Sequence, residues 1–519
     1  MPHYLSDAEL KRTAPAEVAA FRGPIPTQIV SKGEYNPLPQ TREQRRVEAR
    51  VAELAADLAP RHGLSRRKFL ASSAGMAAAF LAMNDVFGPV FEVSRAEAAS
   101  PGVADQRAQA LSGQFIVDAQ THFVRDDFKQ EGLLDLAKYA KANWNPKLWG
   151  ESNLARYKFE NYLKEIFVDS DTKVALLSGA PFDDPTWDLL TNDQIAAART
   201  SINKFAGSRR LLGHSVFTPK KQGWMEEVDR AIATIKPDSW KGYTIGDPLF
   251  PSKLESYWWL DDDKLVYPFY EKAVKSGITT ICIHKGLLPA DYETSWPKVW
   301  EYATVRDVGK AAKDWPKLNF IMYHGALRPF LEKPDAVLAE FEQTGRIKWA
   351  TDLAEIPSKQ GVKNVYGEVG TAFATCAVAN PRFAAAFIGT LVKGLGADHV
   401  IWGTDSLWYG SPQWQIEAFW RFQIPERLQE KWDYPEISKA DKRNMLGLNS
   451  ARLYHVGSTK PKAFRPVPAD FVARMPHDLK TLLEFPGFAS DNLSRMKARY
   501  LAEGPVPDHT RYGWVRTLV

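Results

Sequence analysis

Short runs of apolar, often β-branched residues recur along the chain from residue 115 onward, and stretches with helical periodicity separate them. Near-continuous apolar runs of this kind are typical of parallel strands that are covered on both faces. The pattern predicts eight strands, at 115–117, 173–177, 211–217, 240–244, 278–283, 319–323, 364–369 and 399–402.

Helices are predicted between these strands, because apolar side chains repeat there at helical spacing and glycine or proline often follows. The clearest are 224–235, 267–276, 304–314 and 382–395. Repeated strand–helix units predict an α/β fold, a (β/α)8 TIM barrel over residues 115–455 with long loop insertions. An open, doubly wound sheet is the alternative, but the glycine-rich phosphate loops that usually accompany it are absent from the sequence.

The first 98 residues have a different pattern and are predicted to form a separate N-terminal region. A charged helix is expected at 42–58, and the adjacent arginines Arg66 and Arg67 precede a mildly apolar stretch that ends at Met83. This order resembles a twin-arginine export signal with its core at 65–83. The apolar stretch is shorter than the roughly 20 residues that a membrane span needs.

The sequence Ala-Glu-Ala at 96–98 places small residues where a signal peptidase reads them. We therefore expect the twin-arginine translocation machinery as a partner and the periplasm as the destination. The signal is either removed or retained as an anchor. The alternative is an arginine pair in front of an ordinary core helix.

Composition narrows the class of protein. The 519 residues include 45% hydrophobic and 25% charged residues, which is typical of a globular protein and excludes a wholly disordered chain. A net charge of +5 is too small for a nucleic-acid-binding surface. Two cysteines exclude a disulfide scaffold or a cysteine-rich metal site.

The irregular insertions at 125–170 and 244–264 are long and rich in tryptophan, and they contain Trp144, Trp149, Trp258 and Trp259. Loops that follow barrel strands build the active-site face. These side chains either line a pocket for an apolar or aromatic substrate or pack the loops onto the barrel. Residues 456–519 form a proline-rich C-terminal extension that we expect to pack on the barrel or on a neighbouring subunit.

Polar side chains gather where the predicted strands end. Gln120 and His122 follow the first strand, His284 the fifth, His324 the sixth and Asp405 the eighth. In a closed barrel these strand ends meet on one face. Imidazole nitrogens and a carboxylate oxygen are the ligands that Zn²⁺ and similar divalent ions prefer. Each residue alone has a structural alternative, a core histidine or a helix cap, but together they predict a metal site.

The order of the motifs Val-Asp-x-x-x-His, Ile-His-x-Gly, Tyr-His-Gly and Gly-Thr-Asp-Ser resembles the amidohydrolase superfamily. The branch it most resembles includes aminocarboxymuconate-semialdehyde decarboxylase and resorcylate decarboxylases. Residues 364–368 and the segment 444–454 are similar to that family's seventh strand and closing helix. The resemblance covers residues 115–455.

The resemblance implies roles for individual residues. His122, His284 and Asp405 match metal ligands, and Asp405 also matches the general base or acid. His324 matches a residue that binds metal or polarises the substrate. Gln120 stands where the family usually has the first histidine of His-x-His, and its neutral amide is a weaker ligand. One divalent ion is expected, Zn²⁺ or alternatively Mn²⁺.

Further positions complete the expected site. Trp258, Trp259 and Lys285 are predicted to bind substrate. Lys241 on the fourth strand is interpreted as a surface lysine rather than as the family's bridging lysine, which favours one metal over two.

These features predict a metal-dependent hydrolase of a small cyclic or aromatic substrate, in which Asp405 takes a proton from metal-activated water. The alternative reaction, served by the same residues, is non-oxidative decarboxylation of an aromatic or dienoic acid. A third interpretation is a catalytically inactive barrel that binds a ligand or partner. Barrels of this type are commonly homodimers.

Overall fold

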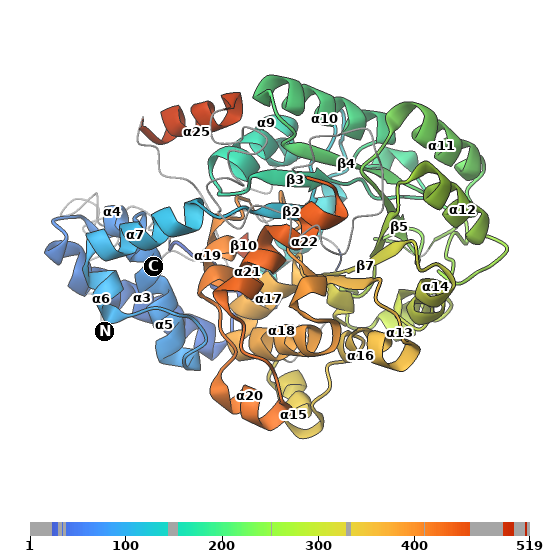
Figure 1. Ribbon diagram of the computed structural model, residues 1–519. Coiled ribbons are helices and arrows are strands. Elements are labelled where there is room, and N and C mark those ends of the chain that lie inside the picture. The colour runs from blue at the N-terminus through green and yellow to red at the C-terminus, as the bar shows by residue number, and fades with distance from the viewer. Residues whose placement is uncertain are drawn as a thin grey trace.

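The computed structural model describes residues 23–29, 34, 38–143, 154–250, 252–328, 334–408, 410–456, 491–502 and 514–515. Eight strands in this part of the chain form a parallel barrel with helices around it (Figure 1). The strands are β2 (Val117–Thr121), β3 (Val174–Leu177), β4 (Leu211–Val216), β5 (Ser239–Tyr243), β6 (Thr280–His284), β7 (Asn319–Tyr323), β8 (Val365–Glu368) and β9 (Val400–Ile401).

The helices fall into three groups along the chain. Those before the barrel are α3 (Arg42–Arg61), α4 (Arg66–Leu70), α5 (Ser73–Phe87), α6 (Arg95–Ala99) and α7 (Pro101–Ser112). Those between strands are α8 (Asp135–Asn143), α9 (Phe159–Tyr162), α10 (Asn192–Ala206), α11 (Trp224–Arg230), α12 (Tyr267–Ser276), α13 (Tyr292–Ser295), α14 (Val308–Asp314), α15 (Pro334–Thr344), α16 (Ala350–Gln360), α17 (Ala372–Ala379) and α18 (Pro381–Leu395). After the last strand come α19 (Gln413–Arg421), α20 (Glu426–Trp432), α21 (Lys439–Arg443), α22 (Asn449–Leu453) and α25 (Asn492–Ala502).

The predicted TIM barrel is confirmed. Neighbouring strands from β2 to β9 pair in sequence order and all run parallel. The barrel closes where Ala119 donates its backbone N–H to the carbonyl of Trp402 at 3.0 Å and Thr121 pairs with Ser406. Each predicted apolar run overlaps an observed strand. The first strand differs most, because the ladder continues through polar Asp118 and Gln120 to Thr121.

Local sequence signals set the ends of the covering helices. Helix α10 begins with a capping box in which Thr191 and Gln194 bond to each other's backbone N–H, and it ends at Gly207 with a φ of 79°. Helix α18 begins at Pro381, after Asn380 accepts a hydrogen bond from the N–H of Arg382. These caps satisfy backbone groups that the helix itself leaves without partners.

The apolar core has two parts. One fills the space between the barrel and the surrounding helices. The other fills the barrel interior below the carboxyl ends of the strands, and the closing helix α22 covers it; its members include Val117, Leu176, Leu212, Cys282, Ile321 and Ile401. The carboxyl ends of the strands therefore lie directly above a packed core, which holds the side chains at those ends in place.

The N-terminal region folds as helices that dock on the barrel. The twin-arginine segment forms α4 and the start of α5, and most side chains of α5 are buried. Glu97 of α6 contacts Arg421 of α19 at 2.7 Å, and Phe91 forms a bridge with Phe422. Among the described residues, no helix combines the length and apolar character needed to cross a membrane. Export remains a prediction.

The described part of the C-terminal extension also packs on the barrel. Asp491, just before α25, forms a buried ion pair with Arg210 at 2.6 Å. Farther along, β10 (Trp514–Val515) pairs antiparallel with β1 (Gln28–Ile29). Most of the predicted extension, residues 457–490, 503–513 and 516–519, lies outside the described residues.

Candidate metal centre

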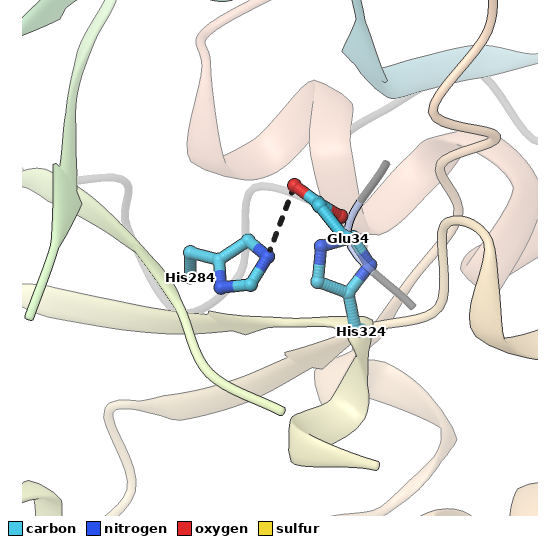
Figure 2. Close-up of side chains that lie close together, drawn as sticks. All are labelled: Glu34, His284 and His324. Atoms are coloured by element: carbon cyan, nitrogen blue, oxygen red, sulfur yellow. Dashed lines mark ion pairs between the residues drawn. The ribbon is translucent and has the colours of Figure 1, made fainter. Parts of the chain in front are cut away.

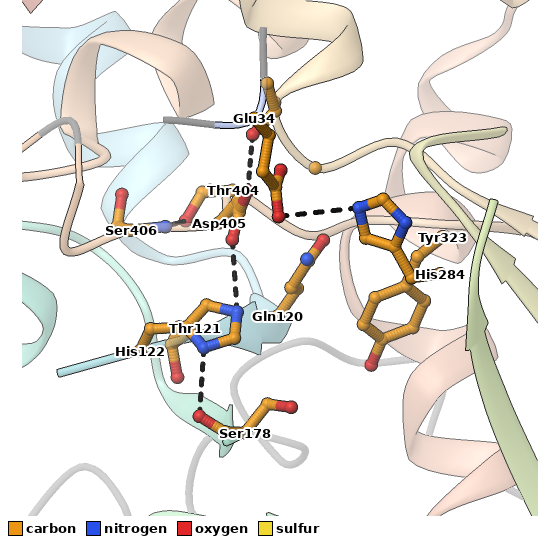
Figure 3. Close-up of polar contacts among 12 residues, drawn as sticks. Glu34, Gln120, Thr121, His122, Ser178, His284, Tyr323, Thr404, Asp405 and Ser406 are labelled. Atoms are coloured by element: carbon orange, nitrogen blue, oxygen red, sulfur yellow. Dashed lines mark hydrogen bonds and ion pairs between the residues drawn. The ribbon is translucent and has the colours of Figure 1, made fainter. Parts of the chain in front are cut away.

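The predicted site residues meet at the carboxyl ends of the strands (Figure 3). His284 ends β6, His324 directly follows β7, and Gln120 and His122 lie at the end of β2. Asp405 follows β9 after a short loop. All five residues are at most 2% exposed. A register shift between Asp118 and Thr121 marks a bulge in β2, and such bulges commonly redirect side chains next to active sites.

Backbone strain is concentrated at the same place. His324, Ala326, Thr371 and Asp405 have φ values of 61°, 52°, 58° and 60°. This left-handed region is uncommon for residues other than glycine, and for a β-branched residue such as Thr371 it is an outlier. Each such residue costs about 1–3 kcal/mol. Clustering of strained residues at strand ends is typical of a functional site.

His122 and Asp405 form a close pair. The Nδ1–H of His122 donates to the carbonyl oxygen of Ser178 at 2.9 Å, so in the neutral imidazole Nε2 carries the lone pair. That Nε2 lies 3.1 Å from Oδ1 of Asp405. Two lone-pair atoms at this distance need one proton or one cation between them. The other Asp405 oxygen accepts a hydrogen bond from Thr371 at 2.6 Å.

His324 is oriented in the same way. Its Nδ1–H donates to the carbonyl oxygen of Gly370 at 2.8 Å, which leaves Nε2 as a lone-pair donor. The amide Nε2 of Gln120 lies 3.5 Å from that atom. A histidine that ligates metal usually donates its second ring N–H to a carbonyl or carboxylate. His122 and His324 both meet this condition.

His284 faces an acidic residue that the sequence analysis missed. Its ring stacks on Tyr243, with centroids 4.8 Å apart, and meets the ring of His324 edge-on at 4.7 Å. Oε1 of Glu34 lies 3.5 Å from its Nε2 (Figure 2). Ligand atoms of Glu34, His284 and His324 all lie within 4.8 Å of one another, and no other group of three such side chains does so among the described residues.

The structure therefore divides the predicted ligand set. His122 and Asp405 contact each other, whereas His284 lies with His324 and Glu34. The assignment of His122, His284 and Asp405 as ligands stays a prediction. Nothing in the periodicity of the first 64 residues indicates Glu34, because it lies in a polar, proline-dotted stretch far from any predicted strand.

Two further carboxyl groups, those of Glu368 and Asp118, are buried next to the site. Glu368 at the end of β8 accepts hydrogen bonds from the N–H groups of His324 and Gly370, and burial raises its pKa to about 8. Asp118 accepts hydrogen bonds from Thr404, and burial raises its pKa to about 7. The position of Glu368 at a strand end was the signal that could have identified it.

Lys241 is not a surface residue, contrary to the interpretation of the sequence. It is fully buried inside the barrel, where its Nζ lies 3.3 Å from the ring centroid of Tyr323. Because β5 is paired on both sides, its side chains face either the barrel interior or the surrounding helices, and Lys241 faces the interior. His214 is a core residue and contacts the hydroxyl groups of Tyr323 and Ser239 at 2.8 Å.

The three residues predicted to bind substrate have structural partners. Trp258 is 2% exposed and donates to the carbonyl of Tyr243. Trp259 stacks on Tyr302, with centroids 4.1 Å apart. Lys285 is buried and contacts both carboxylate oxygens of Asp307 at 3.1 Å. Their contacts fit loop packing better than substrate binding, which stays a prediction. Trp144 and Trp149 lie outside the described residues.

Comparisons with solved structures find similar barrels at low sequence identity. An uncharacterized TIM-barrel protein from Bordetella bronchiseptica is 12% identical, with 66% of this chain and 98% of that chain covered and a TM-score of 0.42. A 2,6-dihydroxybenzoate decarboxylase from Rhizobium is 13% identical, with 66% and 100% covered and a TM-score of 0.40. A dihydroxybenzoic acid decarboxylase from a Polaromonas species, with bound manganese and the inhibitor 2-nitroresorcinol, is 14% identical, with 67% and 98% covered and a TM-score of 0.41.

A search of curated proteins finds no match. The family model described as amidohydrolase matches residues 117–456, which is most of the chain and the whole of the barrel. The matched segment begins with β2 and ends just after α22, so it contains every barrel residue of the candidate site. The chain therefore belongs to the amidohydrolase family and has the fold of an enzyme of that family.

Proposed function

We propose that the protein is a metal-dependent hydrolase that binds one divalent ion, Zn²⁺ or alternatively Mn²⁺, at the carboxyl end of the barrel. The observation that carries the proposal is the orientation of two imidazoles. His122 and His324 each donate Nδ1–H to a backbone carbonyl and direct Nε2 into a cluster that contains carboxylates.

The donor set fits such an ion. Neutral imidazole and carboxylate are the ligands that Zn²⁺ and Mn²⁺ share. Glu34 and Asp405 bring carboxylates to the three histidines, and Asp118 and Glu368 lie buried behind them. Burial of several acidic groups so close together is costly, and a bound cation would offset that cost.

A divalent ion held here would supply electrophilic chemistry, since it would polarise a carbonyl group and lower the pKa of water to about 7. The protein supplies the proton transfers. The Asp405–His122 pair lies at the buried end of the site and can take a proton from the attacking water. The same pair returns the proton to the leaving group when the C–N or C–O bond breaks. Thr371 keeps the carboxylate of Asp405 oriented through the hydrogen bond to Oδ2.

Burial of the pair also favours a second candidate, a non-oxidative decarboxylase. Asp405 is fully buried and His122 is 2% exposed. Decarboxylation needs no water, since the pair only has to deliver a proton to the ring carbon as the bond to the carboxylate breaks. The same residues thus serve either reaction.

A cavity of about 670 Å³ lies among loops of the barrel, and its lining includes no residue of the candidate metal centre. The loops that follow β3 and β5 line it, and its charged side chains are Asp183, Asp184, Asp247 and Lys253. Trp187 and Phe250, whose rings meet edge-on at 5.0 Å, form an apolar wall of this cavity.

Metal content by mass spectrometry tests the proposal. We expect close to one Zn or Mn per wild-type chain and strong loss of it in His284→Ala and Asp405→Ala. His399→Ala is the matched control, because His399 precedes β9 at the opposite end of the barrel and should leave the metal content unchanged. A folded wild-type protein that takes up neither ion would refute the metal-dependent function and favour the binding-protein interpretation.

The reaction is then identified with the metal-loaded enzyme. Esters, lactones and amides of cyclic and aromatic compounds are compared with hydroxybenzoates, with acid release and CO₂ release as the two readouts. Acid release without CO₂ supports the hydrolase. CO₂ release from hydroxybenzoates alone would replace it with the decarboxylase.

We also propose export by the twin-arginine machinery. The support is the sequence around Arg66 and Arg67, which begins α4 on the surface of the N-terminal region, where both side chains are exposed. That machinery carries folded proteins, which suits an enzyme that acquires its metal before transport.

A further inference from the structure

We propose that Glu34 is a metal ligand, so that the N-terminal arm completes the active site of the barrel. The proposal rests on the metal-dependent function above and adds a residue from outside the barrel. It also implies that the N-terminal region stays attached to the working enzyme.

The geometry places Glu34 beside two histidines of the site. Its Oε1 lies 3.5 Å from Nε2 of His284, and its carboxylate lies in the same group of ligand atoms as His324 (Figure 2). The side chain is 14% exposed, whereas that of His284 is 2% exposed. Glu34 therefore covers the solvent side of the histidines, and an ion between these three side chains would be held by one carboxylate and two imidazoles.

The chain on both sides of Glu34 is fixed to the protein. Gln28 is fully buried, and its amide donates to the carbonyl of Leu38 at 3.0 Å, so these residues on either side of Glu34 are linked to each other. Thr27 and Gln40 both donate to Glu48 of α3, at 3.0 and 3.1 Å. The described residues before and after Glu34 are thus anchored to helix α3 and to each other.

The N-terminal arm also contacts the barrel beside the site. The Gln44 amide donates to the carbonyl of Val378 in α17 at 3.0 Å, and β1 also contacts α17. Helix α17 begins directly after Thr371, which holds Asp405. The element that anchors the arm is therefore the one that follows the strained loop of the active site.

The charge of the barrel site explains why a further carboxylate is useful. Gln120 occupies the end of β2 with a neutral amide, 3.5 Å from His324. A neutral amide contributes no charge and is a weak ligand for Zn²⁺. Glu34 supplies a charged oxygen close to the same histidine, so the arm provides what the first strand lacks.

This arrangement bears on the predicted processing site. Cleavage after Ala98 would remove Glu34 together with the whole arm. In the folded protein Ala98 is fully buried within α6, next to Glu97, which pairs with Arg421. A peptidase needs an accessible, extended segment, so a protein exported in its folded state keeps this bond intact.

The test compares Glu34→Gln with Glu53→Gln in the full chain. Both substitutions remove one carboxylate from the N-terminal region, and Glu53 is an exposed residue of α3 that contacts Arg50. Affinities for Zn²⁺ and Mn²⁺ are measured by competition with a chromogenic chelator. We expect Glu34→Gln to weaken binding at least about tenfold and Glu53→Gln to leave it unchanged. Melting curves of the metal-free proteins should coincide, since Glu34 makes no contribution to the apolar core.

A rescue variant tests the compensation directly. Adding Gln120→His to Glu34→Gln should restore most of the lost affinity, because imidazole then replaces the neutral amide. Hydrogen exchange of peptides that span residues 23–44 gives a second readout. Added metal should slow exchange there in the wild type and in Glu53→Gln but not in Glu34→Gln.

The outcomes separate this proposal from the previous one. If wild type and Glu34→Gln bind metal equally well, Glu34 is not a ligand, while the metal-dependent function stands. If the folded wild type binds neither ion, the metal-dependent function fails first. Detection of mature protein that starts after residue 98 and retains full metal affinity would also overturn the role of the arm.

Discussion

Replacement of Asp405 by asparagine should change the chemistry of the protein far more than its stability. In the structure Oδ2 accepts a hydrogen bond from Thr371 at 2.6 Å, and Oδ1 faces the lone pair on Nε2 of His122 at 3.1 Å. An asparagine keeps both contacts, because its amide oxygen accepts from Thr371 and its NH₂ group donates to His122. Asparagine also tolerates the φ of 60° at this position.

Alanine at the same position makes neither of these two hydrogen bonds and does not tolerate the positive φ. Two buried hydrogen bonds are lost, at about 1 kcal/mol each. A left-handed alanine adds about 1–2 kcal/mol of strain. We therefore expect Asp405→Ala to lower the free energy of unfolding by about 3–4 kcal/mol and Asp405→Asn by less than about 1 kcal/mol. Asparagine cannot act as a base, so kcat should fall about 100-fold or more.

Urea unfolding of the metal-free proteins, followed by tryptophan fluorescence, measures this difference. Metal is removed first, because an ion held by Asp405 would add its own contribution to stability. Equal destabilisation by asparagine and alanine would refute the reasoning. It would mean that Asp405 and His122 form a charged pair, whose attraction asparagine cannot replace, rather than a pair that shares one proton between neutral groups.

Three further changes probe the surroundings of the site and the fold. Gly403→Ala should destabilise by about 3 kcal/mol or prevent folding, because its Cβ would clash with Oε1 of the buried Glu368; a urea midpoint equal to wild type would contradict this. Burial lowers the pKa of Lys442 to about 7, so the unfolded chain binds more protons between pH 7 and 10 and wild-type stability rises with pH there. Lys442→Met should therefore raise the free energy of unfolding by about 2 kcal/mol at pH 7, with a gain that shrinks toward pH 10 in pH-dependent melts. Although partial burial disfavours the carboxylate of Glu293, hydrogen bonds from Arg328 help to lower its pKa to about 2, so its stabilisation is present above pH 4.5 and is lost as pH falls to 2. Glu293→Gln should cost about 1 kcal/mol at pH 7 and nothing near pH 2, and a constant cost over that range would argue against the ion pair.

The barrel could be predicted because its strands are buried on both faces and read as apolar runs. Residues at the ends of those runs, such as His284 and His324, follow from the fold, since parallel strands bring their carboxyl ends together. The prediction failed for Lys241, because an inward-facing lysine inside a barrel looks like a polar break in a weak strand. Its contact with the ring of Tyr323 is visible only in three dimensions.

The contribution of the N-terminal arm could not be predicted for a different reason. Glu34 does not belong to any strand or helix of the barrel. Hydrogen bonds of Gln28 and Gln44 anchor the segments on either side of it. Hydrophobic periodicity indicates which face of a helix or strand is buried, but it does not indicate where in the fold an irregular segment lies. The His122–Asp405 contact was likewise hidden, because it depends on the bulge in β2 and on the left-handed backbone of Asp405.

The hydrogen bond between Gln44 and Val378 has a consequence for biosynthesis, because it joins residues 334 positions apart in the chain. At about 5–20 residues per second, a ribosome needs about 17–67 s to make the intervening polypeptide. Throughout that interval the arm has no barrel to dock on, and Arg66 and Arg67 have already left the ribosome. The nascent chain therefore exposes the segment around Arg66 and Arg67 first, and the arm docks on the barrel only near the end of synthesis.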